Sequence, residues 1–244
     1  GISFKQGLFN MASDSHLFRT REELEAQGGQ LEGNVFAMPD GERYLPLYEA
    51  KMIHHYDHRW ATYRHDNTVD VDTADKTDPR LFVYPRYWVS SAESDNRVVM
   101  FWRSGWLVAW RKIARSTDER TFIAACIPRI GYSDSGILGF PVGVGPRRAI
   151  LLRASLSSIP LDFVARQKLG GTNMAHFISQ QLPIPPPLVY DEPVIWGVQM
   201  SAADWLLPRV LELTYTAWDL EPFARDCGYD GPPFRWDEER RFLL

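Results

Sequence analysis

The first sixty residues contain two stretches whose apolar residues are spaced as in helices. Thr20 and Glu23 have the spacing of a capping box and Gly28 follows as a stop, so a short helix is predicted over 21–27. A second helix is predicted from Leu45 onward, because apolar residues recur at every fourth position: Tyr48, Met52, Tyr56 and Trp60.

Two neighbouring stretches are polar and predict irregular structure. Pro39-Asp40-Gly41 has the residues of a turn between two short extended stretches. Residues 66–80 are acidic and polar, and they are predicted to form an exposed loop.

The centre of the chain has the composition of strands. Residues 106–113 and 120–127 are rich in β-branched and aromatic residues, and the polar, basic residues 114–119 separate them. This pattern predicts two strands around a charged loop. Residues 131–145 combine glycines and polar residues with a few large apolar ones, which predicts a further short strand with turns.

Helical spacing returns after residue 150. Leu152, Leu156, Ile159 and Phe163 fall on one helical face, and Pro160 is predicted to kink that helix or to split it in two. Short, mostly antiparallel strands in the centre with helices on either side place the chain in the α+β class.

The remaining helices are predicted from their first residues. Gly170-Gly171 ends the preceding helix, and Thr172 is the predicted N-cap of a helix with the apolar face Met174, Phe177, Ile178 and Leu182. The prolines within 183–187 predict a rigid extended exit. Ser201-Ala-Ala-Asp204 opens the last predicted helix.

The composition is that of an ordinary globular protein. The chain has 244 residues, of which 45% are hydrophobic and 24% are charged, so it is long enough to bury a sizeable core. The sequence contains no apolar run of about 18 residues, which a membrane span would need, and no signal-peptide pattern. Two cysteines are too few for a disulfide framework, so a cytoplasmic location is expected. Because the chain begins at Gly1 and ends at Leu244 within a charged-apolar pattern, it is expected to be a piece of a longer protein.

Charge is distributed unevenly along the chain. The net charge is −4, yet residues 101–170 contain 11 Lys and Arg against 4 Asp and Glu, a balance of 11 − 4 = +7. A basic segment inside an acidic chain is typical of a face that meets phosphate. A solvated cationic face without a ligand is the alternative, as is a surface that meets an acidic protein partner.

Two sets of residues resemble catalytic or metal sites. Asp40, Glu49 and Lys51 have the residue types of a magnesium-dependent PD-(D/E)xK nuclease, although the fourfold spacing places Glu49 and Lys51 on a helix rather than a strand. His54 and His58 are four residues apart and would share one helical face, where they could bind a metal ion together. A structural role for these histidines is the preferred interpretation, and no metal site is predicted.

No complete active site is visible in the sequence. Gly231-Pro232-Pro233-Phe234 differs from the Asn/Asp/Ser-Pro-Pro-aromatic motif of amino-methyltransferases, because glycine has no side chain to accept a hydrogen bond from the target amine. No glycine-rich turn for S-adenosylmethionine, no P-loop and no nucleophile motif is present. The chain itself is therefore expected to bind no cofactor and to catalyse no reaction.

Seven segments follow one another in a characteristic order: Asp14–Leu24, Tyr44–His54, Tyr56–Arg59, Arg115–Thr121, Phe163–Thr172, Gln181–Pro186 and Asp230–Trp236. Together they resemble the region that follows the catalytic domain in large adenine-specific DNA methyltransferases, which belong to type IIG-like restriction–modification systems and to related bacterial phage-defence islands. The resemblance covers nearly the whole chain. The sequence departs from the family where Leu156-Ser-Ser158 replaces a Leu-Asn-Ser run and Ile159-Pro160 interrupts the expected helix.

The resemblance implies a target-recognition domain that binds double-stranded DNA. It implies residues 1–29 as a linker with a short helix, 30–190 as the recognition domain and 191–244 as a helical segment packed on it. An upstream methyltransferase domain of the same polypeptide would transfer a methyl group from S-adenosylmethionine to the N6 atom of a flipped adenine.

The basic segment supplies the expected DNA contacts. From local charge and loop position, Arg115, Thr117 and Arg120 are expected near base edges, and the other candidates near phosphates. Glycines before a helix N-terminus would expose backbone N–H groups to an anion, so Gly170-Gly171 joins the candidates, with a plain helix C-cap as the alternative. The full set of candidate DNA-binding side chains is Arg111, Lys112, Arg115, Thr117, Arg120, Arg147, Arg148, Arg166, Lys168 and Thr172.

Overall fold

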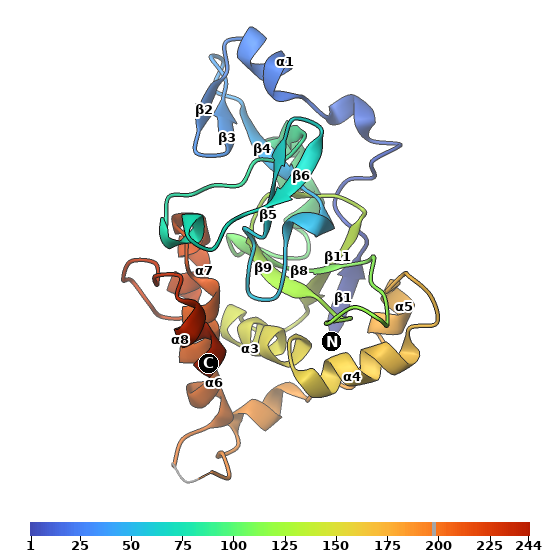
Figure 1. The fold of residues 1–244 in the computed structure, drawn as a ribbon, viewed down its shortest axis with the longest axis vertical. Helices are drawn as coiled ribbons and strands as arrows, with labels where there is room; N and C mark the ends of the chain where they lie inside the picture. The colour runs from blue at the N-terminus through green and yellow to red at the C-terminus, as the bar shows by residue number, and fades with distance from the viewer. Residues whose placement is uncertain (197–198) are drawn as a thin grey trace.

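The protein is built from two antiparallel-rich sheets surrounded by helices (Figure 1). A computed structural model describes residues 1–196 and 199–244. The α+β class is confirmed, because mostly antiparallel strands are combined with helices. The strands are β1 (Ile2–Lys5), β2 (Gln30–Glu32), β3 (Val35–Ala37), β4 (Arg43–Tyr48), β5 (Ala61–Arg64), β6 (Asn67–Asp70), β7 (Trp88–Ser90), β8 (Trp106–Arg111), β9 (Ala124–Pro128), β10 (Gly131–Tyr132) and β11 (Gly136–Pro141).

The four-stranded sheet has the order β1-β11-β8-β9 and is antiparallel throughout. β8 and β9 are almost wholly buried, which explains why their sequences are continuous apolar runs. The predicted strands at 106–113 and 120–127 are confirmed, with shorter bounds. Trp106 and Trp110 of β8 lie in the hydrophobic core.

The second sheet is centred on β4. Its order is β10-β4-β3-β2, and β7 pairs with another part of β4. The predicted turn at Pro39-Asp40-Gly41 joins β3 to β4, and Gly41 has a φ of +87°, a conformation that glycine adopts without strain. A two-stranded hairpin, β5-β6, completes the strands of the described ranges.

Helices cover the sheets and follow them in the chain. They are α1 (Arg21–Ala26), α2 (Ser91–Val98), α3 (Pro146–Leu156), α4 (Ile159–Lys168), α5 (His176–Ser179), α6 (Ala202–Thr214), α7 (Glu221–Asp226) and α8 (Glu238–Leu243). In Figure 1, α3 and α4 lie below β8 and β9, and α6 to α8 lie along one side. Within the described ranges, no helix has the length and apolar character required to cross a membrane.

Several helix ends lie where the local sequence predicts them. The capping box of α1 is present, with the Thr20 side chain bonded to the Glu23 N–H and the Glu23 carboxylate bonded to the Thr20 N–H. Pro160 splits the predicted helix, since α3 ends at Leu156 and α4 begins at Ile159 with proline in its first turn. The Ser201 side chain caps α6 by accepting from the Asp204 N–H. Contrary to the prediction, α6 is not the last helix, because α7 and α8 follow it.

The predicted helix from Leu45 to Trp60 is wrong. Residues 43–48 form β4, which pairs with β3, β7 and β10, and a short 3-10 turn follows at Ala50–Met52. Pro46 disfavours a helix interior because it has no N–H to donate. The large apolar residues at every fourth position lie on a strand and on the tight turn that follows it. Their spacing alone does not distinguish this arrangement from one face of a helix.

The apolar face predicted across Pro160 is also only half buried. Leu152 and Leu156 belong to the core, whereas Ile159 and Phe163 on α4 are 75% and 63% exposed. The break at Pro160 changes the direction of the chain, so the second pair no longer faces the same side.

The segment 66–80 is not the simple exposed loop that its polarity predicts. It contains β6 and a 3-10 turn at Asp75–Thr77, and Lys76 is buried. The Lys76 Nζ lies 2.7 Å from Asp57 Oδ2, and both side chains are almost completely inaccessible to solvent. The Arg59 guanidinium donates to the backbone carbonyls of Lys76 and Thr216 at 3.0 and 3.1 Å, which ties this segment to the C-terminal part of the chain.

The domain boundaries at residues 29 and 190 stay a prediction. Residues 1–29, expected to be a linker with a short helix, also contribute β1, which pairs with β11 at the edge of the four-stranded sheet. A single hydrophobic core includes residues from Leu8 to Ala224 and crosses both boundaries.

The Lys76–Asp57 pair gives a stability prediction. Lys76→Met should lower the free energy of unfolding by about 3–5 kcal/mol, because it leaves the Asp57 carboxylate buried without its partner. Urea denaturation measures the loss. The control Lys51→Met removes an ion pair with Glu49 at a position where half of the lysine is exposed, and it should cost less than about 1 kcal/mol. Equal, small losses in both variants would contradict the assigned role of Lys76.

Candidate nucleic-acid interface

Two loops far apart in sequence form one surface. The loop between β8 and β9 runs beside the segment between α4 and α5, and the two are joined by backbone hydrogen bonds. The Ala114 N–H donates to the Thr172 carbonyl at 3.2 Å, and the Met174 N–H donates to the Lys112 carbonyl at 2.7 Å. Residues 112–118 and 168–174 are called the loop platform below.

Asp162 of α4 fastens the first loop to the helix. Its Oδ1 accepts hydrogen bonds from the buried backbone N–H groups of Thr121 and Phe122, at 2.9 and 2.7 Å. Arg166, one turn later, donates to the carbonyls of Asp118 and Glu119 at 2.8 and 2.9 Å. The loop is therefore held at both its end and its tip by one face of α4.

Three cations of the platform remain available to a ligand. Lys112, Arg115 and Lys168 make no ion pair with a carboxylate in the part of the chain that the structure describes, and Lys168 only approaches the Gln181 amide at 3.4 Å. Thr117 and Thr172 are exposed beside them. These five residues are the members of the predicted set that the structure brings together on a solvent-facing surface.

A shallow hollow of about 390 Å³ lies in the platform. Its lining includes Lys168, Gly170, Gly171, Thr172, Asn173 and Phe177. A Cβ added at either glycine would meet nothing within 4 Å, so this part of the backbone is open to solvent and to a ligand. Asn173 and Phe177 are members of this lining that are not among the predicted DNA-binding residues.

Thr172 is not the N-cap of the helix that follows. The cap of α5 is Ala175, and α5 begins at His176. Residues 172–174 pair instead with residues 112–114, including an antiparallel bridge between Asn173 and Ile113, and this pairing requires an extended backbone. Gly170-Gly171 therefore does not lie at a helix N-terminus, and the anion-binding argument based on that position is wrong.

Three of the arginines predicted to bind DNA, Arg111, Arg120 and Arg166, donate hydrogen bonds to carbonyl groups of the protein itself. Arg111 donates through Nε and Nη2 to the Ile53 carbonyl at 2.9 and 2.7 Å, and burial lowers the pKa of its guanidinium. Arg120 donates to the Ser157 carbonyl at 2.7 Å and lies 3.6 Å from Asp162. With Arg166 occupied by the loop carbonyls, these side chains support the platform from behind.

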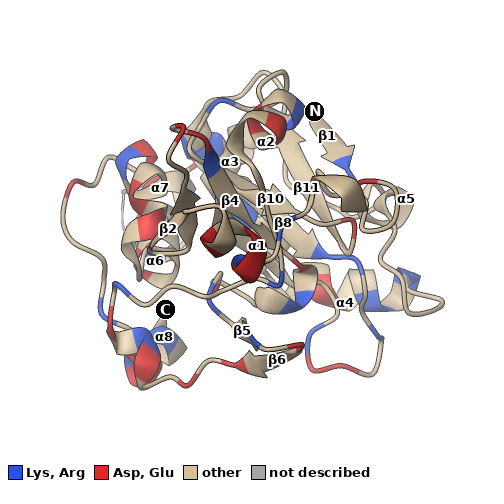
Figure 2. Ribbon diagram, turned by 90° about the horizontal axis from the view of Figure 1, so that it is seen from above, with Lys and Arg blue, Asp and Glu red and all other residues tan. Residues whose placement is uncertain are grey.

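Arg147 and Arg148 lie at the other end of the sheet. β11 pairs Gly136 with Arg111 and Gly139 with Val108, so β11 starts near the platform and runs away from it toward α3. At the start of α3, Arg147 and Arg148 form ion pairs of 2.7 Å with Asp204 and Asp191. Figure 2 likewise shows basic residues on several elements with acidic residues among them. The basic segment of the sequence is thus not one basic face.

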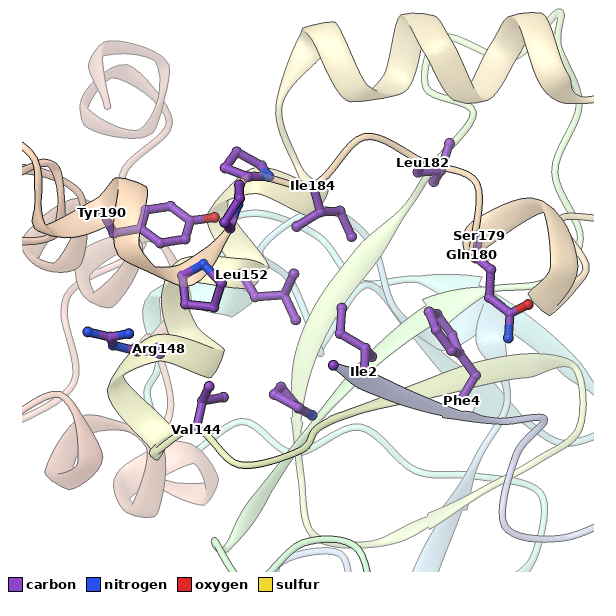
Figure 3. A pocket seen from close by; sticks show the side chains of 15 residues that line it. Ile2, Phe4, Val144, Arg148, Leu152, Ser179, Gln180, Leu182, Ile184 and Tyr190 are labelled. Atoms are coloured by element: carbon purple, nitrogen blue, oxygen red, sulfur yellow. The ribbon is translucent and has the colours of Figure 1, made fainter.

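A second concave region is apolar. A pocket of about 450 Å³ lies between β1, α3 and the segment 179–190, and side chains such as Ile2, Leu152 and Ile184 line it (Figure 3). Arg148, a charged residue of its lining, is already paired with Asp191. The lining residues that the structure describes are otherwise mostly apolar.

The nuclease-like residues do not converge. Asp40 lies in the turn before β4 and Glu49 lies directly after it, so the six-residue strand separates them by about 20 Å. Glu49 instead accepts a hydrogen bond from the Tyr63 hydroxyl and lies 3.5 Å from Lys51 Nζ. The two carboxylates cannot share a magnesium ion in this arrangement.

The histidine pair has partners within the protein. Residues 54–57 form a tight turn, with the His54 ring against the Trp60 ring at 4.4 Å, and His58 Nε2 lies 2.8 Å from Asp219 Oδ1. His54 and His58 are not on a helix, so the spacing argument for a shared metal fails. Among the residues described, no group of three or more His, Cys, Asp or Glu side chains is arranged to hold a metal ion.

Comparison of the chain with protein-family models, with curated proteins and with solved structures finds no match.

The Asp162 carboxylate gives a second stability prediction. Asp162→Ala should lower the free energy of unfolding by about 2–4 kcal/mol, because it leaves the buried N–H groups of Thr121 and Phe122 without an acceptor. Asp162→Asn keeps an acceptor oxygen and should lose less than half as much. Urea denaturation of both variants tests this, and a loss below 1 kcal/mol for the alanine variant would contradict it.

The histidines beside the platform give a pH prediction. Burial lowers the pKa of His54 to about 4 and, together with Arg153 and Arg120, lowers the pKa of His55 to about 2. Above pH 6.5 both are neutral in the folded and unfolded states. Between pH 6.5 and pH 4 it is mainly the unfolded state that binds these protons, so stability falls as the pH is lowered through this range.

Between pH 7 and pH 5 the wild type should therefore lose about 2 kcal/mol more than His55→Gln, from 1.36 kcal/mol per pH unit below 6.5. Urea denaturation at the two pH values measures the difference. His65→Gln, which replaces an exposed histidine, is the control and should behave like the wild type. Parallel losses in all three proteins would show that His55 is protonated in the folded state.

Proposed function

We propose that the chain is a duplex-DNA recognition module of an adenine-N6 DNA methyltransferase. The observation that supports this most is the loop platform, where two segments of the resemblance, Arg115–Thr121 and Phe163–Thr172, are joined by hydrogen bonds from the Arg166 side chain to the carbonyls of Asp118 and Glu119. The platform presents cations that have no carboxylate partner among the described residues, next to exposed hydroxyl, amide and backbone groups. Phosphate recognition uses such cations, and base recognition uses such polar groups.

The five candidate residues that the platform brings together each have a role in the proposal. Lys112, Lys168 and Thr172 contact phosphates. Arg115 and Thr117, at the exposed tip of the first loop, are directed to base edges in the major groove, where arginine pairs with guanine through two hydrogen bonds. Arg120 and Arg166 hold the loop rather than touch DNA, since their guanidinium groups are bonded to Ser157, Asp118 and Glu119.

The chemistry of the proposed parent enzyme lies outside this chain. A methyltransferase domain of the same polypeptide would bind S-adenosylmethionine and methylate the flipped adenine, with or without restriction of unmodified DNA. Ile159 and Phe163, exposed on α4, are apolar residues suited to contact such a domain. The bacterial cytoplasm, where DNA is present and thiols stay reduced, is the proposed compartment.

An assembly module that meets an acidic protein is the competing function, and salt dependence separates the two. A phosphate-binding surface loses affinity for duplex DNA linearly on a logarithmic salt scale, with a slope of about −0.9 for each phosphate neutralised. An assembly module predicts no salt-dependent affinity for duplex DNA.

The double variant Arg115→Ala/Lys168→Ala tests the proposal. It should weaken binding of duplex DNA by tenfold or more at low salt and should reduce the salt slope by about 1, because the base contact of Arg115 and the phosphate contact of Lys168 are lost. Fluorescence anisotropy with a labelled duplex measures both quantities.

Arg103→Ala is the matched control. Arg103 is an exposed arginine of the same basic segment, but it lies before β8, at the opposite end of the strand from Lys112. It should bind DNA like the wild type. Equal effects of the control and the double variant would mean that net charge, and not the platform, governs binding.

A further inference from the structure

Phe177 is an exposed aromatic side chain in the hollow of the loop platform. It lies on α5 and is 57% exposed, although phenylalanine is usually buried in folded proteins. It shares the lining of the hollow with Lys168 and Asn173, so an aromatic ring, a cation and an amide surround one space.

Gln181 links Lys168 to the turn that contains Phe177. Its Nε2 donates to the Phe177 carbonyl at 3.2 Å, and its Oε1 lies 3.4 Å from Lys168 Nζ. The Gln181 amide therefore connects the Lys168 ammonium group to α5. The side chain of Asn173 makes no hydrogen bond within the described residues, so both its donor and its acceptor are free for a ligand.

The floor of the hollow leaves room for a flat ligand. Gly170 and Gly171 contribute only backbone, and nothing lies within 4 Å of the position of a Cβ at either residue. The volume, about 390 Å³, is in the range of sites that hold small organic groups. A nucleobase offers both an aromatic face for Phe177 and an edge for an amide.

We propose that this hollow takes one unpaired nucleotide of the bound DNA. Its base stacks on Phe177, its edge meets the Asn173 amide and its phosphate meets Lys168. Stacking on an aromatic side chain tolerates every base because each has a π-face. This subsite rests on the proposed function, and it suits DNA in which base flipping has left a partner base unpaired.

Three labelled DNAs test the subsite with the 244-residue chain. They are a fully paired duplex, the same duplex with one extra unpaired adenine, and that duplex with an abasic residue in place of the extra adenine. The unpaired adenine should strengthen binding by about fivefold or more, as expected for one base stacked on an aromatic ring, and the abasic DNA should lose that gain. Fluorescence anisotropy gives the three dissociation constants.

Variants assign the gain to Phe177. Phe177→Ala should bind all three DNAs equally, and Phe177→Trp should keep the preference for the unpaired adenine. Phe242→Ala is the matched control, since Phe242 is 91% exposed on α8 and should leave the preference unchanged. Thermal unfolding of each variant confirms that it is folded.

The outcomes separate this proposal from the proposed function. Salt-dependent binding of the paired duplex with no gain from the unpaired adenine overturns the subsite alone. A gain that persists in Phe177→Ala also overturns it. Binding of the unpaired adenine DNA without binding of the paired duplex would support the subsite and overturn duplex recognition, and a chain that binds none of the three DNAs overturns both.

Discussion

The loop platform depends on the attachment of a charged surface loop to α4 by one buried carboxylate. Asp162 accepts two backbone hydrogen bonds where the loop enters β9, and Arg166 on the same helix holds the carbonyls at the tip. A polar loop has little apolar area to bury, so its position must come from such hydrogen bonds. Through this attachment the loop also reaches residues 172–174, and only then do Lys112, Arg115 and Lys168 share one surface.

The largest difference between the sequence-based expectation and the structure concerns where the charged side chains lie. The segment 101–170 is strongly basic, yet Arg111 and Arg153 donate to buried carbonyls, and Arg147 and Arg148 pair with carboxylates at the far end of the sheet. Partnered arginines contribute little to a long-range attraction for phosphate. The candidate interface is therefore smaller than the charge count suggests, and its cations are those that form no ion pair with a carboxylate in the described ranges.

Local sequence signals were sufficient for elements whose cause is local. The α1 capping box, the Ser201 cap, the break at Pro160 and the turn at Gly41 all follow from a few neighbouring residues, and the structure has each of them. The errors came from contacts that no local pattern reveals. β4 is fixed by three other strands, Lys76 is buried by its pairing with Asp57, and Thr172 is extended because residues 112–114 pair with it. For the same reason the sequence indicates each loop of the candidate site separately. It does not indicate that the two loops lie side by side, and it does not indicate the roles of Asp162, Asn173 and Phe177. The sequence signal for Asp162 is its position four residues before Arg166, because side chains with this spacing lie on one face of a helix.

The central claim is that the two loops act as one DNA-contacting surface. Hydrogen–deuterium exchange of the chain with and without a duplex at low salt tests this most directly. The account predicts slower exchange of backbone amides in both 112–118 and 168–174 when DNA is present, with no change at the start of α3. Protection confined to the start of α3 or to the apolar pocket near Ile184, or protection of one loop without the other, would contradict it.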